Sequence, residues 1–157
     1  MTIGTLCAEP VARIRRDATV AEAAMLMRAS HVGDLVVVDT PEGRSPVGII
    51  TDRDIVVEVI GQGFAPAQTP VGSVMSTPVL CLREEDGLLE APEQMAARGV
   101  RRAPIVGRHG HLKGLVSMDD MVPLLARELA KISVLIRREQ TGEARKTEDV
   151  FQDEFAT

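Results

Sequence analysis

Aromatic side chains are nearly absent from this chain, since its 157 residues include three Phe, no Trp and no Tyr. The core must therefore be built from Val, Ile, Leu, Met and Ala, and no stacking surface is left for single-stranded nucleic acid. A net charge of −5 also argues against nucleic acid or an anionic membrane as a partner. No apolar run approaches the length that spans a bilayer. We therefore expect neither nucleic acid nor a membrane among the partners.

Cysteine is scarce as well, and Cys7 and Cys81 lack the CxxC spacing of a redox or metal motif. This favours two reduced thiols over a disulfide. The first ten residues lack the basic segment and apolar core of a signal peptide, so we expect a cytoplasmic protein. His109 and His111 have no third ligand nearby in sequence, so we expect no metal site.

The chain does contain an internal repeat, formed by residues 18–55 and 86–121. One set of residues recurs 68 positions later: Val32, Leu35 and Val38 as Val100, Ala103 and Val106. After a two-residue deletion, a second set recurs 66 positions later: Gly48, Ile50, Thr51 and Asp54 as Gly114, Val116, Ser117 and Asp120. The repeat predicts two small units packed about a pseudo-two-fold axis, with functional clefts where they meet.

Each repeat carries the same order of predicted elements. In the first, we expect a strand at 11–14, a helix opened by the capping box of Thr19 and Glu22, strands at 35–38 and 47–50, and a helix from Thr51 to Gly61. In the second, Pro92 requires the first helix to begin near Ala91 or to be distorted. The fold class is therefore α+β, with two small sheets and two helices in each repeat.

A long helix is predicted after Asp120, to about Gln140, with an apolar stripe formed by Leu125, Leu129, Ile132 and Ile136. The stripe either covers the helix's own domain or contacts a second copy. The acidic tail 141–157 carries Phe151 and Phe155 one turn apart, so it either docks or is disordered. The expected organisation is 5–61 for the first repeat, 62–73 for a linker, 74–122 for the second repeat, and 123–157 for the terminal helix and tail.

The stretches VGIITDRD and KGLVSMDD, with a VxxLxVV-like strand upstream of each and the VMSTPV segment at Val74–Val79, resemble the CBS domain (cystathionine beta-synthase domain). Two in tandem resemble the CBS pair, or Bateman module. The resemblance covers about residues 5–122. It implies a non-catalytic sensor that binds an adenosine-containing ligand between the repeats and forms a homodimer. AMP, ADP or ATP is the ligand most expected, with S-adenosylmethionine, NAD or a cyclic dinucleotide as others.

The resemblance also implies the site residues. Asp54 and Asp120 would accept the ribose hydroxyls, Thr51 and Ser117 would lie near ribose or phosphate, and Val32–Gly33 and Val100–Arg101 would border adenine. Arg101 and Arg102 stand where some members bind phosphate. Arg53, beside Asp54 at a helix start, has the charge to neutralise phosphate there.

The repeats differ in charge, and the resemblance suggests how the clefts are shared. One cleft would combine Thr51, Arg53 and Asp54 with Arg101 and Arg102, and the other Ser117, Asp119 and Asp120 with Gly33 and Asp34. We expect the first cleft to hold the phosphorylated ligand.

Three alternatives remain open on sequence grounds. Thr51-x-x-Asp54 and Ser117-x-x-Asp120 have capping-box spacing, so one alternative is that these residues cap helices and bind no ligand. The chain could be a scaffold that binds no nucleotide and holds an unknown protein effector through its terminal helix. It could also be a metal or redox sensor that uses His109, His111 and the cysteines. Local spacing suggests no nucleophile–His arrangement, and the sequence has no P-loop or GxGxxG motif, so we expect no enzyme activity.

Overall fold

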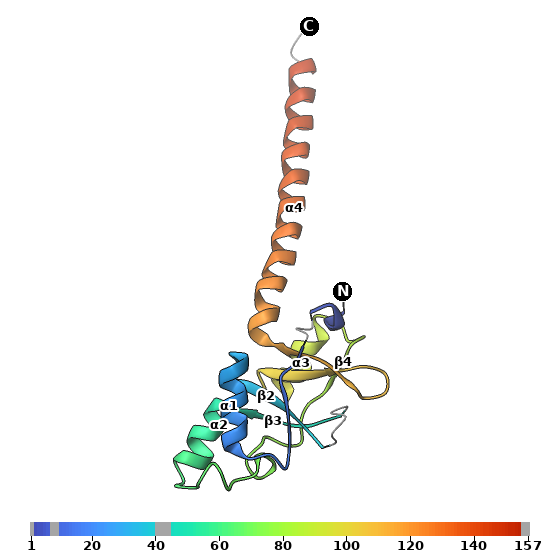
Figure 1. Cartoon of the computed structure of the whole chain (residues 1–157). Coiled ribbons are helices and arrows are strands. Elements are labelled where there is room, and N and C mark those ends of the chain that lie inside the picture. The colour runs from blue at the N-terminus through green and yellow to red at the C-terminus, as the bar shows by residue number, and fades with distance from the viewer. Residues whose placement is uncertain (1, 7–9, 40–44, 155–157) are drawn as a thin grey trace. The chain divides into compact units, whose positions relative to one another are not determined.

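The computed structural model describes the backbone of residues 2–6, 10–39 and 45–154, and the side chains of these residues up to 137 with the exception of 135. The chain divides into two compact units, Met1–Met118 and Asp119–Thr157. The first unit is α+β and contains the three-stranded sheets of both repeats (Figure 1).

The sheets repeat the same topology. In the first, β1 (Arg13–Arg15) runs parallel to β2 (Asp34–Val38), which pairs antiparallel with β3 (Pro46–Thr51). In the second, β4 (Leu82–Arg83), β5 (Arg102–Val106) and β6 (Leu112–Ser117) have the same order and directions. The register shifts after Val37 in one sheet and after Ile105 in the other. These two residues are 68 positions apart, so the irregularity occurs at the equivalent position of both repeats.

The helices of the first repeat form largely as the sequence predicts. The α1 helix (Val20–Ser30) has the predicted capping box, in which the Thr19 N–H donates to Glu22 Oε2 at 2.7 Å. It ends at His31, whose left-handed backbone (φ 54°) stops the helix. The next helix begins as α2 (Asp52–Asp54) and continues as a π-helix, η2 (Ile55–Ile60), a widening that the sequence pattern did not reveal.

In the second repeat, α3 (Glu90–Ala97) begins one residue before the predicted start at Ala91, with Pro92 in its first turn, where proline is tolerated. The lead-in strands are shorter than expected, since β1 begins at Arg13 rather than at residue 11 and β4 has two residues.

The core of the first repeat lies between its helices and one face of its sheet. Side chains from α1, η2 and β1–β3 form one buried cluster, whose members include Val20, Ala23, Leu35, Val37, Ile50 and Val59. Val36 and Val38, on the other face of β2, are buried as well. A strand buried on both faces explains the unbroken apolar run from Leu35 to Val38.

Each of two short 3-10 helices precedes one repeat in sequence but is hydrogen-bonded to the other. The η1 helix (Ile3–Leu6) precedes the first repeat but bonds to the second, since the Ile3 N–H donates to Asp86 O at 3.0 Å. Conversely, η3 (Val71–Ser73) precedes the second repeat but bonds to the first, since the Val71 N–H donates to Ala18 O at 2.8 Å. Ile3 and Val71 are fully buried. The residues that precede each repeat therefore bond to the other repeat and hold the two repeats together.

The second unit contains α4 (Met118–Glu154) apart from the first residue of this helix, Met118, which belongs to the first unit. The predicted end near Gln140 is wrong, because the helix continues through fourteen further residues of mostly polar sequence. Many of these residues are good helix formers, which explains the continuation. The side chain of Phe151 and all of Phe155 lie outside the described residues, and so does the choice between a docked and a disordered tail.

Candidate functional site

The Thr51–Asp54 motif forms a complete capping box at the start of α2. The Asp54 N–H donates to Thr51 Oγ1 at 3.1 Å, and the Thr51 N–H donates to Asp54 Oδ2 at 2.9 Å. The helix-capping role that the spacing predicted is therefore present. A carboxylate offers about four acceptor positions on its two oxygens, so one bond to a backbone N–H leaves capacity for the two hydroxyls of a ribose.

Asp54 also lies on the wall of a pocket of ≈ 420 Å³. The pocket is formed by the helical segment after Asp54 and the chain segment 73–76 ahead of the second repeat; its lining residues are Asp54, Glu58, Gln62, Phe64, Ser73, Val74, Met75 and Ser76. Its volume falls within the usual range for small-molecule sites. Two carboxylates line it, and none of the described lining residues is basic. The pocket therefore suits hydroxyl donors, uncharged groups or cations.

The arginines that the sequence analysis identified do not line the pocket at Asp54. Arg102 Nε stands 3.4 Å from Asp34 Oδ2, and the side chains of Arg102 and Asp34 are 42% and 10% exposed. These two residues are 68 positions apart, so this ion pair joins equivalent positions of the two repeats. Arg53 and Arg101 are exposed and do not line the pocket at Asp54. The structure thus brings together Arg102 and Asp34, which the sequence analysis had assigned to different clefts.

The residues expected to border adenine lie directly before β2 and β5. Val32 is 37% exposed, and the carbonyl of Gly33 accepts from the Asp52 N–H at 2.9 Å. An added Cβ on Gly33 would lie 3.0 Å from Asp52 Oδ2, so the site is tight for a larger residue. The structure therefore places Val32 and Gly33 beside the capping box of their own repeat.

The equivalent segment of the second repeat is arranged in the same way. Val100 is half-buried, and the carbonyl of Arg101 accepts from the Met118 N–H at 2.9 Å. Ser117 ends β6 and is paired in register with Arg102. Asp120 lies in α4 and hence in the second unit.

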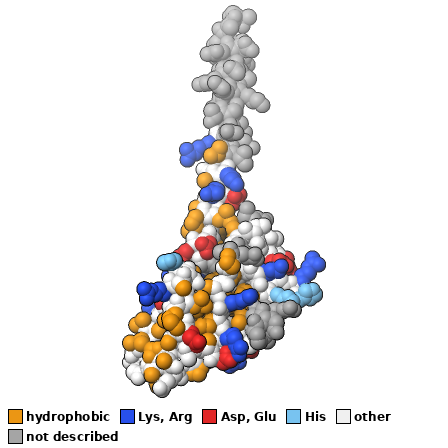
Figure 2. Space-filling view, viewed as in Figure 1, with side chains coloured by type: hydrophobic (Ala, Val, Ile, Leu, Met, Phe, Trp, Pro, Cys, Tyr) orange, Lys and Arg blue, Asp and Glu red, His pale blue; other side chains and the backbone are white. Residues whose placement is uncertain are grey.

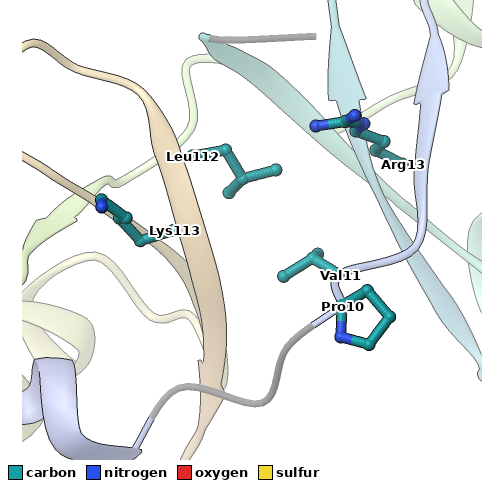
Figure 3. Close-up of a pocket in the computed structure, with 5 residues that line it drawn as sticks. All are labelled: Pro10, Val11, Arg13, Leu112 and Lys113. Carbon is teal, nitrogen blue, oxygen red and sulfur yellow. The ribbon is translucent and has the colours of Figure 1, made fainter.

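A second hollow, of ≈ 240 Å³, lies between the repeats and was missed by the sequence analysis. Pro10, Val11 and Arg13 line it from the lead-in to β1, and Leu112 and Lys113 line it from β6. Figure 3 shows Val11 and Leu112 extending into the gap and Arg13 pointing across from β1. The signal that could have found it was the recurrence of Pro10-Val11 as Pro78-Val79 ahead of both repeats.

The other candidate groups show no built site among the residues described. His109 and His111 have ring centroids 6.1 Å apart, and no described group of three His, Cys, Asp or Glu side chains is arranged to hold a metal ion. Burial raises the pKa of the Cys81 thiol, while Cys7 lies outside the described residues. None of the described helices combines the length and apolar character needed to cross a membrane.

Comparison with known proteins supports the same family over both repeats. The family model described as "CBS domain" matches residues 3–61 and 71–127. The CBS domain-containing protein YhcV of Bacillus subtilis is 37% identical over 111 residues, which are 71% of this chain and 76% of that protein. MK0525 of Methanopyrus kandleri is 39% identical over 104 residues, or 66% of this chain. The chain spans about half of that relative, since the match covers 52% of its length.

Solved structures show the same fold. A hexameric CBS-CP12 protein from bloom-forming cyanobacteria matches with a TM-score of 0.68 and 30% identity, over 78% of this chain and 69% of that one. A CBS domain protein from Pyrobaculum aerophilum complexed with AMP matches with a TM-score of 0.69 and 22% identity, over 76% and 89%. Because the family model matches both repeats and their sheets share one topology, this chain belongs to the CBS-domain family, as a tandem pair of domains.

Proposed function

We propose that this chain is a non-catalytic regulatory module that binds an adenosine-containing ligand and uses Asp54 to hold the ribose. The observation that carries the proposal is the position of Asp54 on the wall of the ≈ 420 Å³ pocket, with acceptor capacity beyond its bond to the Thr51 N–H. Charge-assisted hydrogen bonds from ribose hydroxyls to a carboxylate are stronger than neutral ones. The AMP complex of the Pyrobaculum aerophilum protein supports this ligand class.

The charges suggest how such a ligand would lie. Asp54 and Glu58 repel phosphate, so they favour the nucleoside part of a nucleotide, or a cationic ligand such as S-adenosylmethionine, in this pocket. Arg13 and Lys113 favour anionic groups in the hollow between the repeats. A bound ligand regulates only if its affinity differs between two states of the module. The output would pass to another chain, through an effector protein or a change in the homodimer.

Calorimetric titration of AMP, ADP, ATP and S-adenosylmethionine into the wild type and Asp54→Ala tests the proposal. Loss of the hydrogen bonds to ribose should weaken binding by about tenfold or more, since each bond to a charged group contributes about 1.5–3 kcal/mol. Asp120→Ala, measured in parallel, tests whether the second aspartate also binds. Equal losses from Asp54→Ala and Asp120→Ala would refute the expectation that the ligand binds in the Asp54 cleft rather than in the Asp120 cleft.

Glu22→Ala is the matched control. It removes the carboxylate of the other capping box in the same repeat, where the Thr19 N–H donates to Glu22 Oε2 at 2.7 Å, and Glu22 does not line the pocket. The proposal expects unchanged affinity in this variant. Equal losses of affinity in Glu22→Ala and Asp54→Ala would show that Asp54 acts only through helix capping.

A ligand-free scaffold is the second candidate, because the apolar stripe of α4 is exposed, with Leu129 67% and Ile132 54% accessible. It predicts no thermal shift with any adenosine ligand. A sensor should instead gain about 2.7 kcal/mol of stability at a hundredfold ligand excess over its dissociation constant.

A further inference from the structure

The first half of α4 carries a heptad pattern. Its apolar residues advance by three, four, three and four positions, through Val122, Leu125, Leu129, Ile132 and Ile136. The mean spacing of 3.5 residues is that of a coiled coil, and it keeps a narrow seam facing one partner helix along its whole length. At 1.5 Å per residue, this seam is about 21 Å long.

The seam is exposed. Val122, Leu129, Ile132 and Ile136 are 58%, 67%, 54% and 50% accessible, and Leu125 is half-buried. Figure 2 shows apolar side chains along the described part of this helix. Exposed apolar residues at regular spacing mark an interaction surface rather than scattered surface positions.

The rest of the helix indicates the partner. Arg127 and Lys131 lie on the side opposite the seam, and Lys131 Nζ pairs with Glu128 Oε1 at 2.7 Å along the same helix. Ala126 and Ser133, which flank one side of the seam, are small and uncharged, and Glu128, which flanks the other side, would face Ser133 of a parallel second copy. A second copy of this helix can therefore approach closely without bringing like charges together at these positions. We propose that residues 122–136 of two copies form a two-stranded coiled coil.

A second apolar surface makes a matched control necessary. Met25 of α1, Val56, Val57 and Ile60 of η2, and Phe64 are also exposed, so two copies of the chain could meet there as well. Ile132 and Val134 offer the control within α4, because both are β-branched and similarly exposed, at 54% and 49%. Ile132 lies in the seam, whereas Val134 lies two positions on, on the opposite side of the helix.

Sedimentation equilibrium of the full chain tests the proposal. The wild type should show twice the 16.9 kDa chain mass. Ile132→Asp should raise the dimer dissociation constant at least about tenfold, because the change buries a charge from each copy in the seam. Val134→Asp should leave it unchanged, and Leu129→Asn, a milder seam variant, should weaken the dimer. Circular dichroism verifies that each variant keeps its helix.

Several results would overturn the proposal. One is a monomeric wild type at micromolar concentration, and another is an assembly of more than two copies that Ile132→Asp dissociates. A third is a dimer whose dissociation constant is the same in the wild type, Ile132→Asp and Leu129→Asn. An equal weakening by Val134→Asp and Ile132→Asp would also contradict it.

Discussion

Truncating Ile3 to Ala is expected to destabilise the second repeat, although Ile3 precedes the first repeat in sequence. Ile3 is fully buried, and its N–H donates to Asp86 O at 3.0 Å. Ile→Ala substitutions in a core cost about 2–5 kcal/mol, and the value here depends on how far the space left by the side chain collapses. Because η1 lies on the second repeat and η3 on the first, we expect both repeats to unfold in one cooperative transition.

Urea unfolding followed by far-ultraviolet circular dichroism gives the measurement. Thr5→Ala is the control within the same short helix, because Thr5 is exposed and should change the free energy of unfolding by less than about 0.5 kcal/mol. Val71→Ala, the equivalent truncation in η3, should cost less than Ile3→Ala because it removes fewer carbon atoms. The reasoning fails if Ile3→Ala unfolds like Thr5→Ala, or if the two repeats melt in separate transitions.

Two other predictions concern single side chains. His31→Gly should raise the free energy of unfolding by about 1 kcal/mol in thermal melts, because His31 holds a left-handed backbone (φ 54°) that Gly adopts without steric cost; a lower stability would contradict this. Cys81 should react with iodoacetamide more slowly in the folded chain than in urea near neutral pH, because burial raises the thiol pKa and the thiolate is the reactive form. Its rate, followed by peptide mass spectrometry, should rise as the pH approaches the raised pKa, and equal folded and unfolded rates would refute this.

Local patterns made the framework of this fold predictable from sequence. The capping box of Thr19 and Glu22 set the start of α1, and the apolar run to Val38 marked a strand buried on both faces. Such patterns depend on residues within one turn or one strand, so the local structure that they predict does not require knowledge of distant contacts. The repeat offset carried the same assignment to β4, β5 and β6.

Contacts between distant segments were harder to predict. The placement of η1 and η3 depends on backbone hydrogen bonds to distant segments and on the burial of one side chain from each, Ile3 and Val71, which no local pattern marks. Its one sequence signal was the recurrence of Ile3-Gly4 as Val71-Gly72, 68 positions later. The Arg102–Asp34 pair joins equivalent positions with opposite charge, which the comparison of the repeats had noticed without inferring contact.

The candidate site was only partly predictable. The motif identified Asp54, but the side chains that share its pocket, such as Glu58 and Phe64, follow from how the helix continues beyond it. Nothing in the sequence pattern distinguished an α-helix from a π-helix over Ile55–Ile60, because the apolar spacing is compatible with both.

The π-helix makes the shape of the Asp54 pocket depend on the number of residues in one turn. The N–H groups of Gly61 and Phe64 donate five residues back, to Val56 O and Val59 O. A π-turn accommodates one residue more than an α-turn, so deleting one residue from Ile55–Ile60 would let the segment return to ordinary α-helical winding and leave the chain beyond it in nearly the same orientation. The change would fall on the turn itself, so the pocket wall at Glu58 would differ while Asp54, Gln62 and Phe64 stayed in place. A family member shorter by one residue in this turn could therefore retain the whole Thr-x-x-Asp motif and accept a differently shaped molecule.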